Sequence, residues 1–125
     1  MDRMLAWAPM KRLLALLCAG AAATAAASSA PPKDKLSIDA TLAPTAIHEA
    51  CVRLEAGQAR RWYWKSTQPV DFNIHYHRGE EVSYPVKRDG MRGDGGTFIA
   101  KTGEDYCWMW TAKNANTRVE GRIER

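Results

Sequence analysis

Apolar and polar residues alternate along short segments of this chain. Over residues 70–77 the two faces are Val70, Phe72, Ile74 and Tyr76 against Asp71, Asn73, His75 and His77. A period of two residues is typical of a strand with one buried face. Related segments predict strands over residues 47–54, 59–65, 70–77, 82–87, 97–101, 106–112 and 117–123. With about seven short strands and no helical period, the pattern predicts an all-β fold, a compact antiparallel β-sandwich.

Residues rich in turn formers separate these segments, and they predict turns over residues 55–58, 66–69, 78–81 and 102–105. The glycine-rich stretch over residues 88–96 is interpreted as a mobile connector, with a binding loop as the alternative. Its aspartates do not alternate as calcium ligands do. The tripeptide Arg92-Gly93-Asp94 is a cell-adhesion motif by its letters only.

The N-terminal segment has the pattern of a secretory signal peptide. Basic residues precede an apolar run that begins at Leu13, and alanines follow it up to Ala27. The run is short for a membrane span, and an uncleaved anchor or a lipid anchor on Cys18 are the alternatives. We therefore expect an exported protein, periplasmic or extracellular, with no transmembrane segment in its mature form.

The expected organisation has three parts. Residues 1–27 are the signal peptide, residues 28–45 a flexible linker, and residues 46–125 the β-sandwich domain. Pro31, Pro32 and Pro44 argue against a helix in the linker, where Leu36 and Ile38 could add an edge strand. After cleavage at Ala27 the chain keeps 15 basic and 13 acidic residues. These nearly equal numbers do not predict a nucleic-acid-binding protein, which would need basic residues clustered on one face.

Two cysteines remain after the signal peptide, Cys51 and Cys107. An even number of cysteines in an exported chain predicts a disulfide, and two free buried thiols are the alternative. A bridge across this loop would stabilise the fold by roughly 4 kcal/mol in the chain-entropy account. Both cysteines point away from the most apolar face of their strands. We therefore expect strands 47–54 and 106–112 to be antiparallel neighbours in one sheet.

The stretch from residue 51 to 123 resembles the GOLD (Golgi dynamics) domain, the luminal domain of eukaryotic early-secretory cargo receptors. The matching segments are Glu49-Ala50-Cys51, Leu54-Glu55-Ala56-Gly57, Pro69-Val70-Asp71-Phe72-Asn73-Ile74, Tyr84-Pro85-Val86, Gly95-Gly96-Thr97-Phe98 and Gly103-Glu104-Asp105-Tyr106-Cys107-Trp108-Met109-Trp110. The resemblance implies a β-sandwich with a disulfide between two such cysteines, and a protein- or lipid-interaction module. It supplies no catalytic residues. The format of a stand-alone exported domain looks bacterial, so the trafficking role is not carried over.

His75 and His77 lie on one face of the predicted strand 70–77 and could ligate a metal such as Zn or Cu. A metal site needs further ligands, which Asp71, Glu80, Glu81 or His48 could supply if the fold brought one close. The alternative is a solvated polar strand face.

Four tryptophans form two doublets, Trp62 with Trp64 and Trp108 with Trp110. We expect them in the core because a small domain needs such large apolar side chains. Trp62 is the best candidate for partial exposure. The candidate partner-binding set is Trp62, Asp71, Asn73, Arg92 and Asp94.

No nucleophile occurs beside a base in a recognisable catalytic motif. The sequence therefore predicts an exported, non-catalytic interaction module without a cofactor, which binds a protein, lipid or glycan partner in the cell envelope. The alternatives are a small metal-binding protein that uses His75 and His77, and a structural accessory domain of an envelope complex.

Overall fold

The computed structural model describes residue 20 and residues 35–125. The expected signal peptide lies outside these residues except for Gly20. The chain divides into two units, residues 1–30 and 31–125, and the strands all belong to the second. No helix in the described part of the chain is long and apolar enough to cross a membrane.

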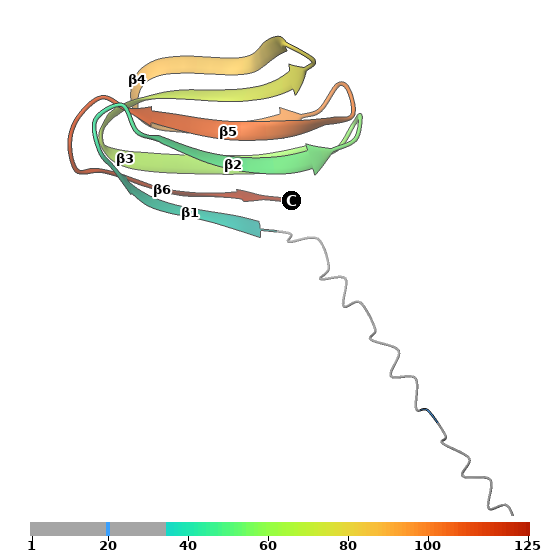
Figure 1. Cartoon of the computed structure of the whole chain (residues 1–125), viewed down its shortest axis with the longest axis horizontal. Coiled ribbons are helices and arrows are strands. Elements are labelled where there is room, and N and C mark those ends of the chain that lie inside the picture. The colour runs from blue at the N-terminus through green and yellow to red at the C-terminus, as the bar shows by residue number, and fades with distance from the viewer. Residues whose placement is uncertain (1–19, 21–34) are drawn as a thin grey trace, which may run out of the picture. The chain divides into compact units, whose positions relative to one another are not determined.

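Six antiparallel strands form a curled sheet, so the all-β, sandwich-like fold predicted from the alternation is confirmed (Figure 1). The strands are β1 (Lys35–Leu42), β2 (Ile47–Leu54), β3 (Ala59–Arg78), β4 (Glu81–Ile99), β5 (Glu104–Ala112) and β6 (Thr117–Glu124).

The long strands β3 and β4 each take part in two layers. Along one side of β3, residues 61–66 pair with β6 and residues 70–75 pair with β5. Along its other side, β3 pairs with β4 through both halves. One layer therefore contains β1, β6 and one half of each long strand, and the other contains β2, β5 and the remaining halves. Figure 1 shows β3 bending and continuing in the second layer as its colour passes from green to yellow-green.

The bend lies where the sequence predicted two connections between strands. These are the turn over residues 66–69, now within β3, and the glycine-rich stretch over residues 88–96, now within β4. Pairing between β3 and β4 is interrupted between Lys65 and Val70, and the Ser66 hydroxyl donates to the Gln68 carbonyl at 2.6 Å in this gap. The predicted turn over residues 66–69 is therefore a bend within one strand. The amide of Gly90, which has a φ of 68°, donates to a carboxylate oxygen of Asp71 across the bend at 2.9 Å.

The glycine-rich stretch is part of β4, and its interpretation as a connecting loop is wrong. Glycines recur here because β4 passes close to β3. A Cβ on Gly93 would lie 3.1 Å from the Trp64 carbonyl oxygen, and one on Gly95 would lie 3.1 Å from that of Trp62. Glycine in a strand is typical of close backbone approach, which periodicity alone does not distinguish from a loop.

Aromatic rings fill the space between the layers. The ring of Trp64 lies 5.3 Å from Phe72 and 6.4 Å from Trp110, measured between centroids. Trp62 also packs against Phe72, with the ring centroids 5.0 Å apart. All four tryptophans of the two doublets are buried, with Trp108 fully so, which confirms the core assignment. Each ring removes a large apolar area from water and stabilises a fold of this size.

The N-terminal boundary of the fold needs correction. β1 begins at Lys35 and pairs with β6 along its whole length, so residues 35–42 are not a linker. Ile38 and Leu42 are buried in the core. The edge strand that Leu36 and Ile38 suggested is confirmed and is longer than expected. Residues 28–34 of the expected linker lie outside the described residues.

The cysteine prediction is confirmed in its pairing and its topology. Cys51 and Cys107 form a disulfide with a Cα–Cα distance of 4.0 Å. They are direct partners in the antiparallel β2–β5 ladder. The bridge therefore joins neighbouring strands on the outer face of one layer, as the strand parity indicated.

Candidate functional site

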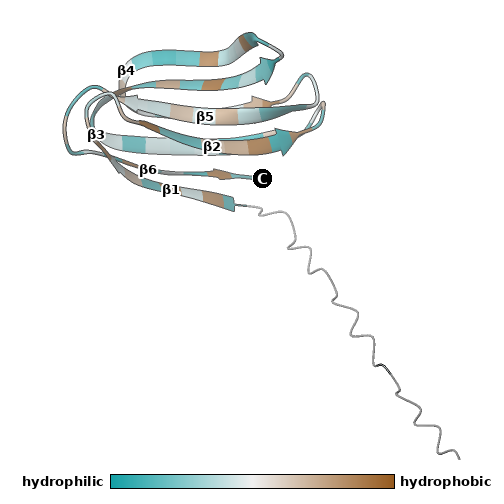
Figure 2. Ribbon diagram, viewed as in Figure 1, coloured by the Kyte–Doolittle hydropathy of each residue, from teal (hydrophilic) through white to brown (hydrophobic). Residues whose placement is uncertain are grey.

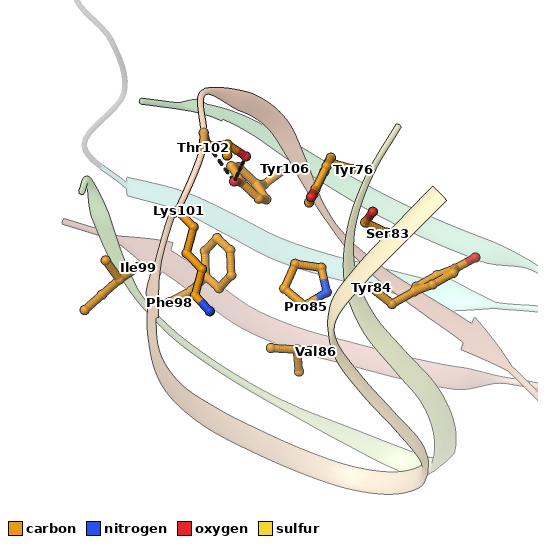
Figure 3. Close-up of a pocket in the computed structure, with 10 residues that line it drawn as sticks. All are labelled: Tyr76, Ser83, Tyr84, Pro85, Val86, Phe98, Ile99, Lys101, Thr102 and Tyr106. Atoms are coloured by element: carbon orange, nitrogen blue, oxygen red, sulfur yellow. Dashed lines mark hydrogen bonds between the residues drawn. The ribbon is translucent and has the colours of Figure 1, made fainter. Parts of the chain in front are cut away.

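A groove of about 560 Å³ opens where the two halves of β4 separate, and we refer to it as the β4 groove. It is lined by Tyr76, Ser83, Tyr84, Pro85, Val86, Phe98, Ile99, Lys101, Thr102 and Tyr106. Figure 3 shows β4 curving beneath it, with Pro85 and Val86 on one arm and Phe98 on the other. Its volume lies within the range of about 300–1,000 Å³ that is typical of small-molecule sites.

Aromatic rings from three strands form the floor of the groove. Tyr106 of β5 lies 5.2 Å from Tyr76 of β3 and 4.9 Å from Phe98 of β4, between ring centroids. The Tyr106 hydroxyl donates to the Thr102 carbonyl at 2.7 Å (Figure 3). Because these rings are fixed by packing and by this hydrogen bond, the floor is already formed without a ligand. Preformed sites lose less conformational entropy on binding.

The rim of the β4 groove carries apolar side chains that are exposed and not buried in the core. Three of the five large hydrophobic side chains exposed in the described residues belong to β4, namely Val82, Tyr84 and Ile99. Of these, Tyr84 is 48% exposed and Ile99 is 60% exposed, and both line the groove. Figure 2 shows hydrophobic bands on the otherwise hydrophilic upper part of β4. Apolar side chains gathered around a concavity are typical of a binding surface.

Lys101 is the charged residue of the lining. It lies two residues after the end of β4, and Figure 3 shows its side chain extending along the Phe98 ring. Lys101 forms no ion pair with the described residues. The carboxylate of Glu104, three residues further on, is held by the Arg78 guanidinium at 2.7 Å. The ammonium group of Lys101 is therefore available to a ligand.

The lining of the groove contains few kinds of polar group. It contains hydroxyl groups and one ammonium group, and it contains no His, Cys, Asp or Glu. The groove therefore offers shape, apolar area and one positive charge.

The histidines of the predicted metal pair lie in different surroundings. His75 is 4% exposed, although it belongs to the face expected to be polar, whereas His77 is exposed. His75 Nδ1 lies 2.7 Å from the Asn73 side-chain oxygen, and its Nε2 lies 3.0 Å from a carboxylate oxygen of Glu49. The His77 ring contacts His75 edge-on, with centroids 5.1 Å apart. Both nitrogens of His75 are thus engaged within the protein.

Burial lowers the pKa of His75 from its ordinary value of 6.5, because the charged ring would lose its hydration. The carboxylate of Glu49 opposes this shift, and His77 reinforces it by like-charge repulsion. Burial is the largest of these effects, so the net shift of the His75 pKa is downward.

The structure brings the Glu49 carboxylate against His75, but in the described part of the chain no group of three potential ligands includes His75 or His77. Among the described residues, the group of three potential ligands that lie close together is Glu49, Cys51 and Cys107. Both of these cysteines are already joined in the disulfide, so neither provides a thiolate.

The candidate partner-binding residues do not form one surface. Trp62 is 6% exposed, so the expectation that it is partly exposed is wrong: its ring packs against Phe72. Asn73 is buried beside His75. Asp71 and Asp94 are engaged within the protein, by Lys113 and Arg88 respectively.

Arg92, the remaining member of that set, lies exposed on β4. Because Arg92-Gly93-Asp94 is part of a strand, this tripeptide is not presented on a loop.

Sequence reasoning missed the β4 groove because its residues come from four separate stretches of the chain. The available signal was weak. Tyr84 and Val86 alternate with Ser83 and Pro85, and Phe98 and Ile99 follow the glycines. Only the bend of β4 brings these two stretches to the same opening.

No protein-family model matches the chain, and no curated protein matches its sequence. Among solved structures, the chain is similar to the crystal structure of Yersinia pseudotuberculosis-derived mitogen (YPM). The TM-score is 0.45 and the sequence identity 9%, over 71% of this chain and 82% of that one. A likeness at this level says nothing of function, which has to be argued from the β4 groove.

Proposed function

We propose that this chain is an exported, non-catalytic interaction module that binds its partner in the β4 groove. The observation that carries the proposal is the groove itself, a preformed aromatic floor under an exposed apolar rim. Tyr84 and Ile99 are left about half exposed at this rim, although burying them elsewhere would stabilise the fold. An apolar concavity with few convergent polar groups is the usual form of a ligand site.

Export is supported by the disulfide between Cys51 and Cys107. Such bonds persist in oxidising compartments, including the bacterial periplasm and the extracellular space. The expected signal peptide over residues 1–27 points in the same direction.

Membership of the GOLD family belongs to the same proposal. A sandwich-like fold with this disulfide is what that resemblance implies, and these two features support it. The implied role, interaction with a protein or a lipid, agrees with a groove that offers apolar area and no catalytic group.

Nuclear magnetic resonance on isotope-labelled mature protein tests the proposal. The probes represent the three expected partner classes. Decanoate stands for a lipid, maltotriose for a glycan and an apolar hexapeptide for a protein. We expect at least one of them to shift the backbone amide signals of Tyr84, Phe98 and Lys101. Signals from β1, on the opposite edge of the sheet, should stay in place.

A blocking variant provides the control. Ser83→Phe adds a ring inside the groove and should abolish these shifts, whereas Ser37→Phe adds one on the exposed part of β1 and should preserve them. If no probe shifts the groove signals at millimolar concentration, the proposed function is wrong.

A further inference from the structure

We infer that the β4 groove takes an acyl-chain carboxylate, with the chain on the aromatic floor and the carboxylate at Lys101. This inference rests on the proposed function, because it assigns a ligand class to the same groove. Three features carry it: the composition of the lining, the interrupted edge of β4, and the ammonium group of Lys101, which forms no ion pair with the described residues.

The lining favours a hydrocarbon chain over a sugar. A sugar ring carries several hydroxyl groups, and each needs a hydrogen-bond partner once it is removed from water. The groove contains no Asp, Glu, Asn, Gln or Arg side chain to supply such partners. Five of its ten lining residues carry a hydroxyl group, and that of Tyr106 already donates to the Thr102 carbonyl. An alkyl chain needs no partner, and each methylene gains from contact with Tyr76, Val86 and Phe98.

The edge of β4 disfavours an added peptide strand. β4 pairs with β3, and its other edge borders the groove. A peptide that adds to a sheet edge depends on an uninterrupted row of backbone donors and acceptors. Pro85 has no N–H, and the β3–β4 register shifts between Ile74 and Tyr76, next to it in the ladder. Proline and irregular pairing are devices that protect an edge from strand addition.

The positive charge of Lys101 in the lining of the groove favours a ligand with an anionic head group. Lys101 is the one charged residue of the lining and forms no ion pair with the described residues. The neighbouring Glu104 is engaged by Arg78 at 2.7 Å. A carboxylate bound at the end of an alkyl chain would supply the missing opposite charge. One end of the ligand is therefore apolar and the other negative.

Isothermal titration of the mature protein with decanoate and with decanol tests the assignment. We expect decanoate to bind more tightly than decanol and hexanoate to bind more weakly than decanoate. The loss should be up to about four-fold per methylene removed. Lys101→Met should weaken decanoate binding by about five-fold, the upper range for an exposed charge pair, and leave decanol unchanged.

Further variants separate charge from packing. Lys101→Glu should weaken decanoate binding more than Lys101→Met, and Lys101→Arg should restore it. Lys35→Met removes the same charge from exposed Lys35 of β1 and should have no effect.

The outcomes show whether the assigned ligand class is wrong or the proposed function itself is wrong. Equal binding of decanoate and decanol, unchanged by Lys101→Met, would overturn the carboxylate assignment while the groove remained a binding site. Preference for maltotriose or for the apolar hexapeptide in the groove would overturn the acyl-chain assignment in the same way. If none of the probes binds in the groove, both proposals are wrong.

Discussion

A carboxylate oxygen of Glu49 lies 3.0 Å from Nε2 of His75, on the outer face of the layer that contains β2, β5 and part of β3. The other ring nitrogen of His75 lies 2.7 Å from the Asn73 side-chain oxygen. The disulfide is next to this group, because Cys107 is the partner of His75 in the β3–β5 ladder. A buried imidazole therefore lies between two polar side chains beside the covalent link of the sheet.

This arrangement makes stability depend on pH. The pKa of His75 is lowered in the folded protein, mainly by burial, whereas the unfolded chain titrates near 6.5. Below pH 6.5 the unfolded chain takes up a proton that the folded protein does not, so the free energy of unfolding decreases as the pH falls. Above pH 6.5 the contribution is fully present. Urea unfolding between pH 8 and pH 5 measures this slope.

His75→Gln should remove part of that slope, because glutamine does not titrate. His77→Gln is the matched control, since His77 is exposed, and should retain it. An identical pH dependence in the wild type and His75→Gln would contradict the assignment.

A second prediction concerns Gly121, which lies opposite Trp64 in the β3–β6 ladder. A Cβ at this position would lie 2.3 Å from the Tyr63 carbonyl oxygen and 2.7 Å from the Trp64 Cβ. Because one of these atoms is backbone, neither strand can yield without disturbing the ladder. We expect Gly121→Ala to lower the free energy of unfolding by about 3 kcal/mol or more.

Gly96→Ala is the matched control for this substitution. A Cβ on Gly96 would meet the Trp62 ring at 3.6 Å, which is ordinary contact, so its effect should stay within about 1 kcal/mol. Equal destabilisation by the two alanines would show that Trp64 does not need the space at Gly121.

A third prediction concerns the disulfide. Cys51→Ala/Cys107→Ala should lower the free energy of unfolding by about 2–4 kcal/mol, because the open chain gains conformational entropy when it unfolds. Reduction of the wild type should have a similar effect. Urea unfolding with and without reductant measures both, and unchanged stability would contradict the structural role of the bridge.

A fourth prediction concerns metal binding. The nitrogens of His75 contact Glu49 and Asn73, and no further ligand group gathers at His77 in the described part of the chain. We expect protein purified without a histidine tag to contain no stoichiometric Zn or Cu. Elemental analysis checks this, and a metal lost in His75→Ala/His77→Ala would restore the metal-binding hypothesis.

Strand parity was sufficient to predict that the disulfide joins neighbouring strands of one sheet. Side chains alternate across a strand, so the face of Cys51 and that of Cys107 could be determined from their neighbours alone. The need of a small domain for large apolar side chains was sufficient to predict that Trp64 and Trp110 lie in the core. The alternation Leu36, Ile38, Ala40 and Leu42 also carried a signal for β1, but flanking prolines obscured it.

The bend of β3 and β4 could not be predicted in this way. Gly93 and Gly95 serve the close approach of two strands, and a period of two does not distinguish this use of glycine from a loop. The groove depends on that bend, since it brings Tyr84, Phe98 and Lys101 to the lining of the same opening. The candidate site therefore became visible only with the fold.

The most direct test of the account is a crystal structure of the mature protein grown with decanoate. We expect the alkyl chain between Tyr76, Val86 and Phe98, with its carboxylate within hydrogen-bond distance of Lys101 Nζ. Decanoate bound elsewhere on the protein, with the β4 groove closed or filled by its own side chains, would contradict the account.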